Sequence, residues 1–474
     1  MKYVSTRGGV APIEFQDAVM MGLADDGGLL VPQDIPHVAS RCASGPPAVL
    51  TRWADLPYDQ LALEVLAPFI GDIPEADLKD LLARTYAPGA FSPSPAPTRA
   101  VGPIHVLELW HGPTLAFKDL ALQLLGNLFE YILARRGGRL NILGATSGDT
   151  GSAAICGLRG RRNIEVFMLH PQGRVSPIQA RQMTTVLDPN IHNVALEGSF
   201  DDCQHIMKSL LCDLPFKRDY SLGAVNSVNW ARVLAQIVYY FRSSLDVIKS
   251  TGAPAVRMAV PTGNFGDVLA GWYAMQMGAP IRQLILASNE NDILARFFNT
   301  GLYSLGQVHQ TLAPAMDIQV ASNFERYLYY RLGGDGQRLR GMMEDFARTG
   351  RLTVPAEPGE SVDPAFAAAS ADRQQVLDTI RNFHQQYDYL LDPHTAVGVS
   401  VAMRLAQPTR ADPLICLSTA HAAKFPEAIR LATGKDLARH PAIDALADLP
   451  TRCENLPNDP QAVRLLIRQT LAAR

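Results

Sequence analysis

Residues 140–158 read LNILGATSGDTGSAAICGL, and this stretch decides the fold class. Residues 140–143 are mostly apolar and predict a buried strand, while residues 150–158 carry the small and apolar side chains of a packed helix. The turn between them, Gly144 to Ser152, consists of small residues and hydroxyls. A strand, a tight turn and a helix in this order form the repeating unit of α/β proteins.

The chain on both sides of this stretch repeats the alternation. Further strands are predicted at 106–109, 164–169, 192–196, 257–260, 281–287 and 414–417. Further helices are predicted at 115–135, 178–186, 202–211 and 267–277. Strands that alternate with helices predict an α/β fold with mostly parallel sheets.

The length of 474 residues predicts two or three packed units. Residues 1–92 form a predicted N-terminal domain with helices at 56–70 and 75–86, and a proline-rich linker follows these helices. Residues 93–435 form the predicted main α/β region, in which 354–377 are Pro/Ala-rich and are interpreted as a surface insertion. Residues 436–474 carry no motif, are predicted to be a packing segment and contain a short helix at 461–471.

Composition excludes several classes of function. A formal net charge of −3 gives no broad attraction for nucleic acid or anionic lipid. No stretch approaches the roughly 18 apolar residues of a membrane span. The six cysteines are scattered and form neither a zinc pattern nor a disulfide framework. These features predict a cytoplasmic protein with no metal site.

Four segments are suited to ligand chemistry. The turns 144–152, 261–267 and 417–421 each follow an apolar strand, where an open α/β sheet binds ligands and helix amides favour anions. Taken singly, 144–152 can equally be a tight turn with a Ser or Thr cap and 261–267 a plain strand–turn–helix joint, while a helix cap is the preferred interpretation of 417–421. The fourth segment, 110–119, places Lys118 in an apolar stretch. A surface lysine is the usual interpretation of such a position, but partial burial would lower the pKa of the amine and make it a usable nucleophile. These patterns predict a site for a phosphorylated ligand but no particular reaction.

At this point the motifs HGPTLAFKD, GATSGDTGSAA, PTGNFGD and LSTAHAAKF, in this order, resemble threonine synthase. The opening segment 3–9 and the stretch 26–29 are similar to the longer form of that family, which has its own N-terminal domain. The resemblance implies the tryptophan-synthase-β type of pyridoxal-phosphate (PLP) fold, with the cofactor between two α/β subdomains. It also implies a carbon–oxygen lyase that converts O-phospho-L-homoserine and water to L-threonine and phosphate, the last step of threonine biosynthesis.

The resemblance also implies roles for individual residues. Lys118 would carry PLP as a Schiff base and transfer protons as the catalytic residue. The other residues expected to bind the cofactor are Asp149, Thr262, Gly263, Asn264, Phe265, Gly266 and Thr419. The residues expected to bind the substrate are Ser147, Gly148, Thr150, Asn229 and Arg232, with Arg7 and Lys208 as weaker candidates for its phosphate. A surface ion pair is the alternative for Arg232, and a structural role is favoured for His111.

Three other functions are alternatives. A PLP-dependent dehydratase acting on serine or threonine would share the lysine and the glycine-rich turns, but not a second phosphate pocket. A binding protein that has lost the chemistry is disfavoured by the intact Lys118, Asp149 and Thr419. A nucleotide-dependent enzyme lacks both the Walker lysine and a dinucleotide fingerprint. The resemblance favours a monomer, with a homodimer as the alternative.

Overall fold

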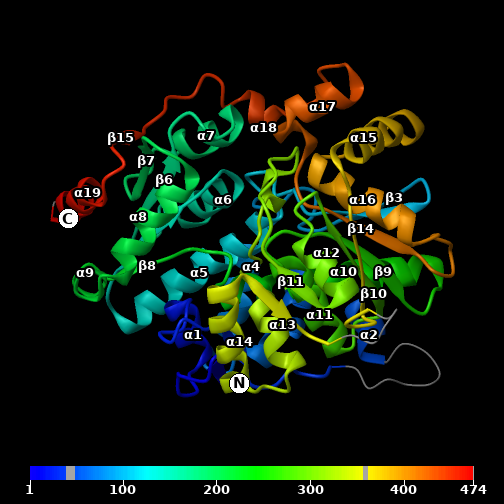
Figure 1. Ribbon diagram of the computed structural model, residues 1–474, viewed down its shortest axis with the longest axis horizontal. Helices are drawn as coiled ribbons and strands as arrows, with labels where there is room; N and C mark the ends of the chain where they lie inside the picture. The colour runs from blue at the N-terminus through cyan, green and yellow to red at the C-terminus, as the bar shows by residue number, and fades with distance from the viewer. Residues whose placement is uncertain (39–47, 356–360, 473–474) are drawn as a thin grey trace.

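The computed structural model describes residues 1–38, 48–355 and 361–472 (Figure 1). Two sheets organise the α/β region. The first has the order β13-β10-β9-β14-β4-β3, and the second has the order β15-β7-β6-β5-β8. In the first sheet only β3 runs antiparallel to its neighbour, and all pairs in the second sheet are parallel. The prediction of mostly parallel sheets is therefore confirmed.

The predicted strands lie at the centre of these sheets. The strands of the first sheet are β13 (Phe366–Ser370), β10 (Ile281–Ser288), β9 (Val256–Pro261), β14 (Leu414–Ser418), β4 (Ile104–Glu108) and β3 (Thr98–Val101). The strands of the second sheet are β15 (Glu454–Leu456), β7 (Ile191–Leu196), β6 (Ile164–Pro171), β5 (Leu140–Ala145) and β8 (Leu222–Gly223). Within these two sheets, the strands missing from the prediction (β3, β8, β13 and β15) are all at sheet edges, where short polar or Ala-rich sequences give a weak strand signal.

Helices cover both faces of the first sheet. One face packs on α16 (Pro393–Leu405), with α15 (Arg373–Tyr387) and α17 (Pro426–Thr433) outside it. The other face packs on α10 (Trp230–Thr251) and α11 (Gly266–Met277). Alternate residues of the strands enter two separate apolar clusters, as the period of two requires.

Helix α5 (Lys118–Arg136) connects the two sheets and packs on both α10 and α6 (Asp149–Leu158). Its predicted beginning at Leu115 is wrong by three residues. Leu115 adopts a left-handed backbone with φ of 58°, and the side chain of Asp119 accepts a hydrogen bond from the Thr114 N–H at 2.8 Å. This turn delays the helix so that Lys118 is its first residue.

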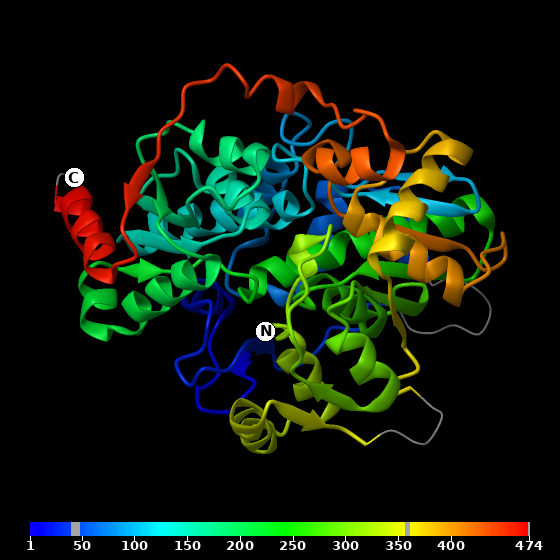
Figure 2. The same cartoon turned by 45° about the horizontal axis from the view of Figure 1, so that its top comes forward.

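The second sheet is enclosed by helices and by the C-terminal segment. The helices around it are α6, α7 (Pro177–Thr184), α8 (Phe200–Cys212), α9 (Leu214–Asp219) and α19 (Pro460–Ala472). Figure 2 shows the chain after α17 passing through α18 (Pro441–Asp444) and over the molecule to β15 and α19. The chain beyond 436 thus adds a strand and a helix to the second sheet.

The N-terminal residues pack onto α10 and α5 rather than forming a separate core. Their elements are β1 (Tyr3–Ser5), α1 (Phe15–Met21), β2 (Leu30–Pro32), α2 (Ala48–Trp53), α3 (Tyr58–Leu66), the short helix η1 (Ala67–Phe69) and α4 (Glu75–Thr85). The buried Tyr3 hydroxyl accepts from Trp230 Nε1 at 3.0 Å and donates to the Phe69 carbonyl at 2.9 Å. Side chains from this region and from α10 belong to one apolar cluster.

The interpretation of 354–377 as a surface insertion is wrong for its second half. Residues 366–370 form β13, which pairs in parallel with β10, and α15 begins at Arg373. Residues 356–360 lie outside the described part of the chain. The alanines of this strand were not recognised, because alanine is uncommon in strands. Their small side chains let α12 (Ile293–Thr300) and α16 pack closely on this edge strand.

The remaining elements lie between β10 and β13 and after β14. They are β11 (Leu302–Ser304), η2 (Pro314–Met316), α13 (Phe324–Arg331), α14 (Gly336–Thr349), β12 (Arg351–Thr353) and η3 (Ala422–Lys424). Across the described residues, no helix is both long enough and apolar enough to cross a membrane. Each of the five described cysteines is free, and Cys42 lies outside the described residues.

Candidate active site

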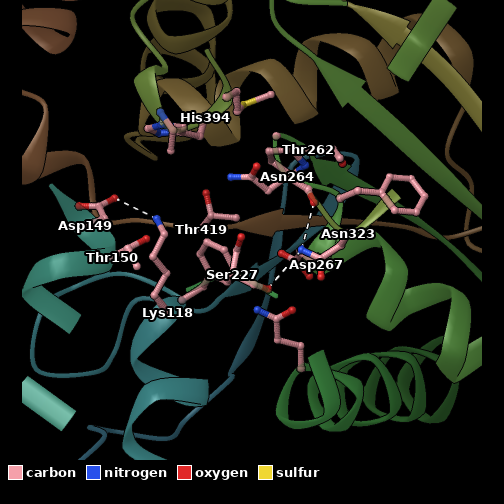
Figure 3. Close-up of a pocket in the computed structure, with 18 of the residues that line it drawn as sticks. Lys118, Asp149, Thr150, Ser227, Thr262, Asn264, Asp267, Asn323, His394 and Thr419 are labelled. Atoms are coloured by element: carbon pink, nitrogen blue, oxygen red, sulfur yellow. Dashed lines mark hydrogen bonds and ion pairs between the residues drawn. The ribbon is translucent and has the colours of Figure 1, made fainter. Parts of the chain in front are cut away.

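A pocket lies where the carboxyl ends of β9 and β14 face the first turns of α5, α6 and α11. In Figure 3, Lys118 and Asp149 lie on one side of it, Asn264, Asp267 and Asn323 lie on the other, and Thr419 lies between them. Ten of the predicted site residues line this pocket: Lys118, Asp149, Thr150, Arg232, Thr262, Gly263, Asn264, Phe265, Gly266 and Thr419.

Lys118 is a buried amine. Its side chain is 11% exposed, and Nζ lies 3.4 Å from Oδ2 of Asp149 and 5.1 Å from the centre of the Phe117 ring. Burial lowers the pKa of Lys118, and the positive charges of Lys424 and Arg232 lower it further, while Asp149 opposes them. A lysine with a lowered pKa has a larger fraction of neutral amine, which is the form that attacks carbonyl groups and accepts protons.

Asp149 is a fully paired carboxylate at the first position of α6. Its Oδ1 lies 2.8 Å from Lys424 Nζ and accepts a hydrogen bond from Gln179 Nε2 at 2.8 Å. Burial opposes ionisation, but Lys424, Lys118 and Gln179 together hold the pKa of Asp149 well below its usual range. Asp149 is therefore a fixed negative charge beside the lysine.

The turn after β9 forms a cradle of backbone amides. Phe265 adopts a left-handed backbone with φ of 65°, and no side chain caps α11, which begins at Gly266. A Cβ at Gly263 would lie 2.6 Å from the Ala315 carbonyl oxygen, so only glycine allows this backbone path. Because the first N–H groups of a helix lack intrahelical acceptors, this turn fits the phosphate group of PLP.

Sequence reasoning missed Asp267, a buried carboxyl group in the first turn of α11. Its Oδ1 accepts hydrogen bonds from the hydroxyls of Tyr239 at 2.6 Å and Tyr240 at 2.8 Å, and its Oδ2 is buried without a hydrogen-bond partner among the described residues. Burial raises the pKa of Asp267 to about 6, although the two tyrosine hydroxyls oppose this shift. The group lines the pocket within the PTGNFGD motif, so its position in the motif was the available signal.

Arg232 brings an uncompensated cation to the pocket. It is 5% exposed, and its Nε and Nη1 have no hydrogen-bond partner within the described residues. The Oε1 atom of Gln236, one turn further along α10, is also buried without a partner there. Burial lowers the pKa of Arg232 to about 10. A buried guanidinium with free donors fits an anionic ligand, and the structure shows no surface ion pair of Arg232 with any described residue.

Thr419 follows β14 and is 7% exposed in the pocket wall. Its carbonyl oxygen accepts from the Phe117 N–H at 2.9 Å, so the residue is fixed to the turn before Lys118. His394, which the sequence did not single out, also lines the pocket; its Nδ1 lies 2.9 Å from Oδ1 of Asp392.

Three predicted substrate-binding residues do not line the pocket. Ser147 is exposed, and Gly148, with φ of 151°, leaves room for Gln179, whose Oε1 would lie 2.3 Å from a Cβ. Asn229 uses its whole side chain elsewhere: Oδ1 accepts from the Ala231 N–H at 3.1 Å, and Nδ2 donates to the Val19 carbonyl at 2.9 Å. Asn229 therefore caps α10 and ties it to α1.

The weaker candidates also lie elsewhere. The Nη2 atom of Arg7 forms an ion pair with Glu325 at 2.9 Å, and Lys208 is exposed on α8. His111 bridges Glu108 and the Ser92 carbonyl, which agrees with the structural role favoured for it. Within residues 1–38, 48–355 and 361–472, no group of three or more His, Cys, Asp or Glu side chains is placed to bind a metal ion.

Several other pocket residues carried weak sequence signals. They are Ser227, Gln236, Asn323 and His394. The Nδ2 atom of Asn323 lies 3.2 Å from the carbonyl oxygens of both Ser227 and Asn264, so it joins the turn before α10 to the cradle. These residues are isolated polar positions in the sequence, and only the fold brings them together.

Comparison with known proteins agrees with this geometry. Three family models match the chain: "Threonine synthase N terminus" over residues 2–86, "Pyridoxal-phosphate dependent enzyme" over 89–419, and "Threonine synthase, C-terminal" over 395–467. The threonine synthase of Pseudomonas aeruginosa is 45% identical over 99% of this chain and 98% of its own length. The threonine synthase of Schizosaccharomyces pombe is 45% identical over 91% of this chain and 89% of its own length.

Solved structures give the same result. The PLP-bound threonine synthase of Brucella melitensis superposes with a TM-score of 0.92, at 43% identity and 99% coverage of both chains. The yeast threonine synthase also has a TM-score of 0.92, at 39% identity, with 100% of this chain and 99% of that chain covered. The predicted fold and cofactor are confirmed, and the comparisons favour the predicted activity over the dehydratase. The chain belongs to the threonine synthase family of pyridoxal-phosphate-dependent enzymes.

Proposed function

We propose that this pocket converts O-phospho-L-homoserine and water to L-threonine and phosphate, with Lys118 as the catalytic residue. One observation supports the assignment most strongly. The buried amine of Lys118 shares its pocket with the amide cradle at Gly263–Gly266 and with the guanidinium of Arg232, whose Nε and Nη1 have no hydrogen-bond partner among the described residues. The proposed reaction brings two phosphate groups into the pocket, one on the cofactor and one on the substrate, whereas a dehydratase binds only the phosphate group of the cofactor.

Five residues of the cradle would hold the cofactor phosphate: Thr262, Gly263, Asn264, Phe265 and Gly266. Thr419 and Asp149 would contact the cofactor ring from the other side of the pocket. When bound, PLP supplies an electron sink that makes the α proton of an attached amino acid acidic.

The chain's own contribution is the placement of protons and charges. Nζ of Lys118 would bind the cofactor covalently and, once displaced by the substrate amine, take the proton from the substrate Cα. Its lowered pKa provides the neutral amine for this step. Because the amine is buried, bulk water does not compete for the proton, and the same nitrogen can return it to Cα.

The substrate is oriented at its two charged ends. Arg232 would bind the phosphate of O-phospho-L-homoserine, with the partnerless Gln236 Oε1 one turn away. Thr150, in the first turn of α6, would bind the α-carboxylate, for which the positive end of the helix dipole is favourable. Ser147 and Gly148 would act through the backbone that shapes this helix start.

The experiment that separates the two activities uses one holoenzyme preparation. Phosphate release from O-phospho-L-homoserine is measured beside keto-acid release from threonine and serine. We expect phosphate and threonine to form in equal amounts, with keto-acid release slower by about a hundredfold or more, since a site with an empty phosphate pocket loses the binding energy of charge-assisted hydrogen bonds. Keto acid as the main product would contradict the proposal.

We further propose a cytoplasmic monomer, as the resemblance suggests. Sedimentation equilibrium distinguishes a 51.6 kDa monomer from a dimer of twice that mass.

A further inference from the structure

Lys424 is a fully buried cation in the LSTAHAAKF motif, and the sequence predicted no role for it. Its side chain is 0% exposed, and it lies in η3, directly after β14. Nζ lies 2.8 Å from Oδ1 of Asp149 and donates to the Thr114 carbonyl at 2.7 Å. A buried ammonium group is costly unless it is paired, so a lysine in this position requires these partners.

Lys424 and its two partners, Asp149 and Thr114, come from three different parts of the site. Asp149 begins α6 after a strand of the second sheet, whereas Lys424 follows a strand of the first sheet. Thr114 lies in the turn that precedes Lys118, and the same carbonyl accepts from Gln182 Nε2 at 3.0 Å. One side chain therefore joins the two sheets and the turn that carries the reactive lysine.

The charges around Lys118 come from every element packed against it. Asp149 on α6, Lys424 on η3, Arg232 on α10 and Asp267 on α11 all act on this amine. The carboxyl of Asp119, on α5 itself, is bonded to Thr114. Asp149 is the carboxylate within ion-pair distance of Lys118, at 3.4 Å, but its shorter ion pair, at 2.8 Å, is with Lys424.

This geometry determines which lysine balances the charge of Asp149. If Asp149 faced Lys118 alone, the buried carboxylate would hold that lysine as an ammonium ion. With Lys424 in place, the negative charge of Asp149 is already balanced. We propose that Lys424 is a positioning residue that balances Asp149 and fixes the Thr114 turn, so that the Lys118 amine is released from the carboxylate for its chemistry. This inference rests on the proposed role of Lys118.

The test measures the pH dependence of the reaction between Lys118 and PLP in the full-length protein after removal of the cofactor. Adduct formation is followed by absorbance, trapped with borohydride and located by mass spectrometry of the Lys118 peptide. In Lys424→Met the midpoint of the rate profile should move to higher pH by about one unit, so that the rate near neutral pH falls about tenfold. The acid limb of kcat in the holoenzyme should move in the same direction.

Companion variants separate a role in charge balance from a role in packing. Lys424→Arg keeps the positive charge. Its pH midpoint for adduct formation should therefore equal that of the native protein, even if the adduct forms more slowly. Asp149→Asn should lower the midpoint, and the double variant K424M/D149N should have a midpoint at or below the native one. The exposed Lys208→Met is the matched control and should be unchanged.

Two results would overturn the inference. One is a native midpoint in Lys424→Met, and the other is an Asp149→Asn midpoint that does not fall. The second result remains measurable if Lys424→Met does not fold. Failure of the proposed function is distinguishable, because it would show as the absence of a pyridoxyl adduct on Lys118 in the native protein.

Discussion

Nζ of Lys118 lies 3.4 Å from Oδ2 of Asp149, and each residue is the first of a helix. Helix α5 follows a strand of the first sheet, and α6 follows a strand of the second. The reactive amine and its neighbouring carboxylate are therefore placed by different sheets, and any relative movement of the sheets would change their separation.

Replacing the amine tests the assignment of the catalytic residue. Lys118→Ala should lower kcat by about a thousandfold or more, since nucleophilic and general-base roles are lost together. The measurements are phosphate release at saturating substrate and mass spectrometry of the borohydride-reduced native protein, which should carry the pyridoxyl group on the Lys118 peptide. Full turnover by Lys118→Ala would contradict the assignment, and the exposed Lys208→Ala should behave as the native enzyme does.

The unpartnered guanidinium of Arg232 predicts opposite effects on binding and stability. Arg232→Met should raise KM for O-phospho-L-homoserine by about tenfold to a thousandfold, because each charge-assisted hydrogen bond contributes about 1.5–3 kcal/mol. The ligand-free variant should melt at a higher temperature than the native protein, because an uncompensated buried charge has been removed.

The control for this prediction is Arg7→Met. Arg7 forms its ion pair with Glu325 outside the pocket, so its loss should affect stability and leave KM unchanged. If Arg232→Met bound substrate normally but lost PLP, the guanidinium would belong to the cofactor site instead.

Asn229 separates a structural role from the substrate-binding role that the resemblance implied. Asn229→Ala removes the cap of α10 and the hydrogen bond to the Val19 carbonyl. We expect a loss of about 1–3 kcal/mol in the free energy of unfolding, measured by urea denaturation, with KM within about twofold of native. A large rise in KM at unchanged stability would restore Asn229 to the substrate site.

The sequence predicted the repeating part of the fold and the residues that sit inside motifs. Strands and helices on both sides of 140–158 were found because their apolar residues follow regular periods. Helix α10 was missed although it has 22 residues. Its buried residues include polar ones, such as Arg232, Gln236 and Ser243, which a search for apolar periods does not count as core positions.

The difference between local patterns and tertiary contacts also explains which site residues were predicted. Lys118, Gly263 and Thr419 were predicted because each stands in a recognisable segment after a strand. Lys424 also stands in such a segment, LSTAHAAKF, but a lysine there reads as a surface residue until Asp149 is brought to it from the other sheet. Pairing across sheets depends on the tertiary fold and leaves no spacing pattern in the chain.

The carboxyl group of Asp267 predicts a pH dependence of stability. Burial raises the pKa of Asp267 to about 6, above the value of about 4 in an unfolded chain. Between these values the folded state binds the proton and the unfolded state does not, so this group makes the protein less stable as pH rises. The free energy of unfolding falls by about 3 kcal/mol in total, and this loss is complete above a pH of about 6.

Asp267→Asn removes this titration. Urea denaturation of the cofactor-free protein at several pH values should show the native protein losing stability relative to the variant as pH rises from about 4 to about 6. Parallel stability curves for the two proteins would show that the carboxyl group is ionised throughout.

Gly263 tests the amide cradle directly. A Cβ at this position would lie 2.6 Å from the Ala315 carbonyl oxygen and 3.1 Å from the Met316 Cα, and both are backbone atoms that cannot rotate away. Gly263→Ala must therefore displace the turn and the amides that follow it. We expect the affinity for PLP to fall by about tenfold or more, measured by absorbance titration of the cofactor-free protein, since a small displacement weakens several hydrogen bonds to one phosphate group at once.

Gly89→Ala is the matched control, because a Cβ at Gly89 has no atom within 4 Å. Unchanged PLP affinity in Gly263→Ala would mean that the phosphate group is held elsewhere in the pocket, and Arg232 would then be the first alternative to examine.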